Sequence, residues 1–94
     1  MIEKIAERKL MVLDEVSGQS SEFVVQIGRP YWVEPGIDAV CPVRIEGGLE
    51  EEVNIFGVDE LSALDLAIGF IKTYLLNLPP TKKVYWSDGE PYFD

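Results

Sequence analysis

The 94-residue chain is long enough for a single domain with a modest hydrophobic core. Its 17 acidic and 8 basic residues give a net charge of -9, which argues against direct binding of nucleic acid, because phosphate binding needs a basic surface. The sequence shows neither an apolar run of membrane-spanning length nor a secretory signal at its start. A cytoplasmic bacterial protein that does not bind membranes is therefore expected.

The first half of the chain has the pattern of β-strands joined by turns. Residues 2–13 predict a first strand, and the composition of residues 17–21 predicts the turn that follows it. Residues 22–33 alternate apolar and polar side chains, which predicts a second strand. Strand pairing is expected to stop or bulge at Gly28–Pro30, because proline cannot donate a ladder hydrogen bond. The Pro-Gly pair within residues 34–38 predicts another turn.

Residues 39–58 predict a β-hairpin whose register follows from its apolar side chains. A two-residue loop at 47–48 would place apolar residues opposite polar ones. A three-residue loop at 47–49 instead places apolar residues opposite apolar ones and polar residues opposite polar ones. The favoured register pairs Val43 with Val53, Cys41 with Ile55, and Arg44 with Glu52.

Residues 59–78 predict the one clear helix, with Asp59 as its N-cap and the following prolines ending it. At about 100° per residue, Leu66 and Leu76 fall in the polar arc. The opposite arc, wide enough to lie across a sheet, contains Leu61, Leu64, Ala67, Ile68, Ile71, Tyr74, Leu75 and Leu78.

Residues 82–86 predict a last short strand, followed by a turn and a short tail. The order of elements is therefore β-β-β-β-α-β. This order predicts one α+β domain spanning residues 1–94, with an antiparallel sheet of four to five strands and the long helix packed on one face.

Three stretches of this chain resemble a family of short, uncharacterised bacterial proteins. They read GVDELSALDLAIGFI at the start of the helix, GRPYW with CPVRIEG in the middle, and VYWSDGEPY near the end. The resemblance covers most of the chain and implies a bacterial, single-domain protein. Because that family has no assigned activity, the resemblance implies no catalytic or binding residue. A looser similarity, in size, acidity and α+β class only, is to immunity proteins of bacterial toxin systems.

The residue types needed for common enzyme chemistry are missing or poorly placed. There is no histidine, which removes the commonest general base and metal ligand. The single cysteine, Cys41, is predicted to point into the core, where a thiol is structural and not reactive. No serine has a base to activate it, and no phosphate loop or metal motif is present. We therefore expect no enzymatic activity, no cofactor and no metal.

Six of the ten aromatic residues lie in two stretches, which share a Gly-x-Pro-Tyr unit at 28–31 and 89–92. In each adjacent Tyr-Trp pair one ring is expected to enter the core under the helix, and the other to face outward. If the two stretches lie together, their outward members form a protein-binding surface. The candidate residues are Arg29, Tyr31, Trp32, Tyr85, Trp86, Asp88, Glu90 and Tyr92. The alternative is packing alone, in which the tail folds back and Tyr92 and Phe93 cover the open face of the sheet.

Three functional hypotheses follow. The first is a non-catalytic protein-interaction module with an unknown protein partner, of an immunity-like or regulatory kind. The second is a structural homo-oligomer, such as a homodimer, that uses Leu66, Leu76 or the aromatic surface. The third is a small enzyme or ligand binder that uses two convergent carboxylates, which would need a deep pocket and perturbed pKa values.

Overall fold

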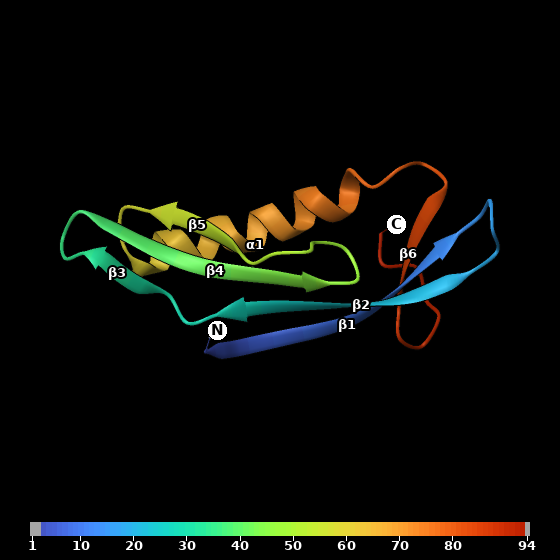
Figure 1. Ribbon diagram of the computed structural model, residues 1–94, viewed down its shortest axis with the longest axis horizontal. Helices are drawn as coiled ribbons and strands as arrows, with labels where there is room; N and C mark the ends of the chain where they lie inside the picture. The colour runs from blue at the N-terminus through green and yellow to red at the C-terminus, as the bar shows by residue number, and fades with distance from the viewer. Residues whose placement is uncertain (1–2, 94) are drawn as a thin grey trace.

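The computed structural model describes residues 3–93, and it contains six β-strands and one α-helix (Figure 1). The elements are β1 (Lys4–Asp14), β2 (Ser20–Gly28), β3 (Tyr31–Glu34), β4 (Asp38–Glu46), β5 (Val53–Gly57), α1 (Glu60–Leu76) and β6 (Lys82–Trp86). The prediction of an antiparallel α+β fold with one helix on the sheet is confirmed. Among the described residues, no helix is long and apolar enough to span a membrane.

The sheet has six strands because the predicted strand 22–33 is divided at Arg29 and Pro30 into β2 and β3. Both parts pair with the same side of β4, through Ile27 opposite Val43 and Tyr31 opposite Val40. The predicted interruption at Gly28–Pro30 is thus confirmed, and its cause is the missing N–H of the proline.

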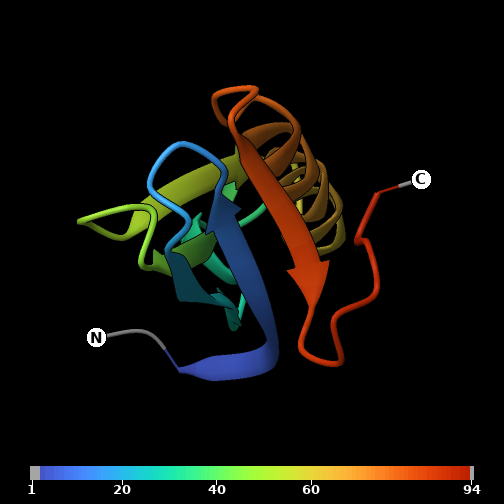
Figure 2. The same ribbon diagram turned by 90° about the vertical axis from the view of Figure 1, so that its right-hand side faces the viewer.

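The sheet is ordered β5-β4-β2-β1-β6, with β3 continuing the line of β2 beside β4. Helix α1 runs over β4 and β5 and carries the chain from β5, at one edge of the sheet, to β6, at the other (Figure 1). Figure 2, which looks along the long axis, shows β6 beside β1 and the end of the chain folding back beside β6. The molecule is elongated, with a longest extent of 48 Å.

The hairpin of β4 and β5 has the predicted register but not the predicted loop. Val43 lies opposite Val53 and Cys41 opposite Ile55, as expected. Pairing stops there, however, and the predicted pair of Arg44 with Glu52 does not form, because the chain leaves the ladder before Val53. The connection between the two strands spans residues 47–52 and is therefore longer than three residues.

Helix α1 begins as predicted, with Oδ1 of Asp59 accepting a hydrogen bond from the backbone N–H of Ser62 (2.6 Å). The residues that it buries are Ala63, Ala67, Ile71 and Leu75. Together with the inward side chains of β1, β2, β4 and β6, these residues form the core.

The prediction that Leu61 faces the sheet is wrong, because its side chain is 75% exposed. Ile68 does face the side of β1 and β2, but its side chain is still 54% exposed because the helix does not cover those strands fully. Gly57 at the end of β5 lies directly against the backbone at Ala63, so the first turn of the helix presents a small residue to the sheet.

Candidate functional site

One end of the molecule, formed by β3, β5 and the start of β4, carries exposed aromatic side chains. Tyr31, Val40 and Phe56 lie in one row across these strands, on the face of the sheet away from the helix. Val40 is buried, whereas Tyr31 and Phe56 on either side of it are 49% and 56% exposed. Two large rings therefore flank a buried valine, and about half of the surface of each ring residue is open to solvent.

Further apolar side chains lie at this end of the molecule, and Trp32, opposite Ala39 of the core, is on the helix side of the sheet. Trp32, Val33 and Ile37 are also exposed. We call the five residues the aromatic end: Tyr31, Trp32, Val33, Ile37 and Phe56. The expectation that one member of the Tyr31-Trp32 pair enters the core is wrong, since both side chains are exposed. The reason is that β3 pairs only with β4 among the described strands and forms an edge of the sheet.

Acids outnumber bases in the part of the chain that includes this end, although Glu46, Glu50, Glu51 and Glu52 lie at the far end of the β4–β5 hairpin. Residues 30–71 hold nine acids and one base, a net charge of -8, whereas the other 52 residues hold eight acids and seven bases, a net charge of -1. Glu34 and Asp38 lie in β3 and β4 beside the aromatic end, and Asp59 and Glu60 lie at the start of α1. The aromatic surface is thus set in a negative field.

The second aromatic stretch lies on β6 and the tail, and it is largely packed against itself. The tail pairs with β6: the backbone N–H of Trp86 donates to the carbonyl of Glu90 (2.8 Å), and that of Tyr92 donates to the carbonyl of Val84 (3.0 Å). The carboxylate of Asp88 accepts a hydrogen bond from the N–H of Glu90 (3.0 Å) and so holds the turn. The carboxylate of Asp88 and the backbone of Glu90 therefore have a local structural role.

Arg8 of β1 organises the rings of this tail cluster, which consists of Arg8, Trp86, Tyr92 and Phe93. Its guanidinium carbon lies 4.8 Å from the ring centroid of Trp86, and its Nη1 donates to the hydroxyl of Tyr92 (2.7 Å). The rings of Trp86 and Tyr92 are 4.8 Å apart, and those of Tyr92 and Phe93 are 4.9 Å apart. Cation–π and edge contacts of this kind contribute about 0.5–1.5 kcal/mol each.

The tail folds back, as the packing alternative predicted, but onto a different face. Tyr92 and Phe93 pack against the core cluster and lie beside Trp86 and Arg8, on the side of the sheet that carries the helix. The prediction that they cover the open face is therefore wrong. Tyr85, which lies opposite Met11, is the half-buried member of the second Tyr-Trp pair and faces the other side.

The prediction that the two aromatic stretches form one surface is also wrong. Trp86 lies opposite Leu10, which lies opposite Phe23, and this row meets β4 next to Glu46. Tyr31 lies opposite Val40, six residues from Glu46 along β4. At about 3.3 Å per residue, the two rows are at least roughly 20 Å apart along the strands. Figure 1 shows β3 and β6 at opposite ends of the long axis.

Arg29, the remaining predicted site residue, lies next to β3. Its guanidinium is 3.8 Å from the carboxylate of Glu3, and its backbone N–H donates to the carbonyl of Glu3. Both side chains of this ion pair are largely exposed, so the pair contributes little to stability. Arg29 therefore places one positive charge beside the aromatic end.

Two residues that the sequence interpretation passed over belong to these surfaces. Phe56 could have been found from the alternation of its strand, because Val53 and Ile55 point to the helix side and Phe56 must point away. Arg8 had no local signal, because it meets Tyr92 only through the pairing of β1 with β6.

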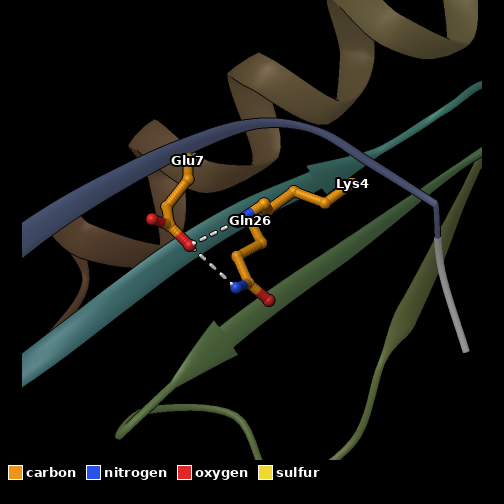
Figure 3. A network of polar contacts seen from close by, with 3 residues as sticks. All are labelled: Lys4, Glu7 and Gln26. Atoms are coloured by element: carbon orange, nitrogen blue, oxygen red, sulfur yellow. Dashed lines mark hydrogen bonds and ion pairs between the residues drawn. The ribbon is translucent and has the colours of Figure 1, made fainter.

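A polar network occupies the middle of the open face, between the two ends. Oε1 of Glu7 accepts hydrogen bonds from Nε2 of Gln26 and from Nζ of Lys4, both at 3.0 Å (Figure 3). The hydrogen bond from Gln26, and then that from Lys4, lower the pKa of Glu7 below its ordinary value. The network joins β1 to β2 on the surface.

Cys41 is buried in the centre of the core cluster, and burial raises the pKa of its thiol. Its Sγ lies 3.5 Å from the carbonyl oxygen of Gly28, as a weak hydrogen-bond donor. The predicted core position of Cys41 is confirmed. Within residues 3–93, no three side chains of the metal-binding types Cys, Asp and Glu gather into a group that could hold an ion.

No family model, curated protein or solved structure gives a significant match to this chain. The resemblance to short bacterial proteins therefore stays a prediction. What the chain does must be argued from its own surfaces.

Proposed function

We propose that this protein is a non-catalytic protein-interaction module that binds a basic partner through the aromatic end. The observation that carries the proposal is the exposure of Tyr31 and Phe56 across the buried Val40, near the acids Glu34, Asp38, Asp59 and Glu60. Large rings around a desolvated centre are typical of binding hot spots.

The charge favours a different protein over a second copy of this chain. Two copies docked through the aromatic end would bring two strongly negative regions together, which costs free energy. A partner that presents Lys and Arg is instead attracted, and its cations fit over the faces of Tyr31 and Phe56. Electrostatic attraction of this kind also accelerates association.

A photo-crosslinking amino acid placed at position 31 tests the proposal in lysate of the source organism, with the same group at position 85 as the control. Position 85 lies on the same face of the sheet but on β6, at the other end of the molecule. We expect a basic protein to crosslink from position 31 and not from position 85.

The crosslinked protein is then purified and its affinity measured directly. We expect the double variant Tyr31→Ala/Phe56→Ala to lose about 2 kcal/mol or more of binding free energy, roughly thirtyfold in Kd. Affinity should also fall steeply with added salt. A partner that is acidic, that binds independently of these rings, or that proves to be a second copy of this chain would overturn the proposal.

A further inference from the structure

A groove lies between α1 and the sheet, far from the aromatic end. Its volume is about 570 Å³, within the range of roughly 300–1,000 Å³ that is typical of small-molecule sites. Leu10, Val25 and Ile27, all buried, form its floor on β1 and β2. The groove exists because α1 lies over β4 and β5 and leaves the inner faces of β1 and β2 only partly covered.

The walls of the groove are apolar, and they come from two elements distant in sequence. Ile68 of α1, which is 54% exposed, lines one side. Trp86, Tyr92 and Phe93 of the tail cluster line the other side and are only partly buried. The exposure of Ile68 and Trp86 leaves apolar surface that a ligand could remove from water, at about 25 cal/mol for each Å².

The charged side chains that line the groove are mainly cationic, in a protein whose net charge is -9. Arg8 and Lys72 line it, and within residues 3–93 neither forms an ion pair with a carboxylate. Arg8 gives one hydrogen bond to Tyr92, so other donors of its guanidinium are available to an anion. Glu7 borders the groove, but its carboxylate lies on the open face of the sheet, where Gln26 and Lys4 bind it.

We propose that this groove binds a free medium-chain fatty acid. The hydrocarbon chain lies on the floor between Ile68 and the tail rings, and the carboxylate pairs with Arg8 and Lys72. This site is separate from the aromatic end, and either proposal can fail without the other.

The two tryptophans make the test direct, because Trp86 lines the groove and Trp32 lies at the opposite end. The variant Trp32→Phe leaves Trp86 as the sole fluorescent tryptophan, and Trp86→Phe leaves Trp32. We titrate both with decanoate, kept below its micellar concentration, and with decanol as the uncharged analogue. Saturable binding of decanoate, seen through Trp86 but not through Trp32, with weaker binding of decanol, is the expected result.

Helix substitutions then locate the site. Ile68→Glu places a carboxylate in the wall and is expected to abolish decanoate binding, whereas Leu66→Glu, at an equally exposed position outside the groove, should leave it unchanged. Lys72→Gln is expected to weaken decanoate about fivefold, the upper end for an exposed ion pair, and to leave decanol unchanged. The proposal would be overturned if Trp86 showed no saturable response, or if the two ligands bound equally well. It would also be overturned if the protein bound only anionic lipid vesicles, or if Leu66→Glu lost binding as well.

Discussion

Gly57 is the residue at which the sheet touches the helix, and replacing it by alanine tests how the two elements are packed. A Cβ at this position would lie 2.8 Å from both Cα of Ala63 and the carbonyl carbon of Ser62, and against the amide nitrogen of Ala63. All three atoms belong to the backbone at the start of α1, so no side chain can rotate away to relieve the contact. On its other side, Gly57 is paired with the fully buried Ala39.

Gly57→Ala must therefore push the start of α1 off β5. Overpacking of this kind costs about 1–3 kcal/mol of stability. Alanine also restricts the unfolded chain more than glycine does, which stabilises the folded state by roughly 0.4–1 kcal/mol. The overpacking is the larger effect. We expect a net decrease in the free energy of unfolding of about 1–2 kcal/mol. For a domain of this size, each kcal/mol lowers Tm by about 4–8 °C.

Gly69→Ala is the matched control. Gly69 lies inside α1, and a Cβ there would meet no atom within 4 Å. The same substitution should therefore stabilise the protein by about 0.5–1 kcal/mol through helix propensity. Urea unfolding followed by tryptophan fluorescence and circular dichroism measures both variants. If Gly57→Ala were as stable as the parent while Gly69→Ala showed its gain, the close approach of β5 to α1 would be incorrect.

Three further predictions concern the core, the surface network and the thiol. Leu75→Ala, at a position 3% exposed, should lower the free energy of unfolding by about 2–5 kcal/mol, whereas Leu76→Ala, 56% exposed, should change it by less than about 0.5 kcal/mol; equal effects would contradict the orientation of the helix. Glu7 should titrate below its ordinary pKa in NMR-detected pH titrations, so its contribution to stability is present near neutral pH and is lost as pH falls through the lowered value. Gln26→Ala should return the pKa of Glu7 toward its ordinary value, and no change would argue against the hydrogen bond between them. Cys41 should stay unmodified by a thiol reagent in the native protein and react fully once denaturant unfolds it; rapid native labelling would place the thiol at the surface.

Local sequence patterns determined the secondary structure of this protein with little ambiguity. The helix and its N-cap at Asp59 follow from a polar capping residue before an apolar periodic run, and both depend on neighbours a few residues apart. The break at Gly28–Pro30 follows from the covalent structure of proline. The register of Val43 with Val53 follows because a one-residue slip would move every apolar side chain to the wrong face.

The tertiary structure decided which side chains gather on the surface, because that depends on contacts between residues far apart in sequence. The aromatic content of the two stretches selected both Tyr31 and Trp86 as site residues. Only the pairing of their strands shows that they lie toward opposite ends of the molecule. The periodicity of the helix placed Leu61 inward, but the packing of α1 on the sheet leaves it 75% exposed and brings Ala63 against Gly57 instead. Arg8 and Tyr92 are 84 residues apart in the chain, so no local sequence pattern could predict their hydrogen bond.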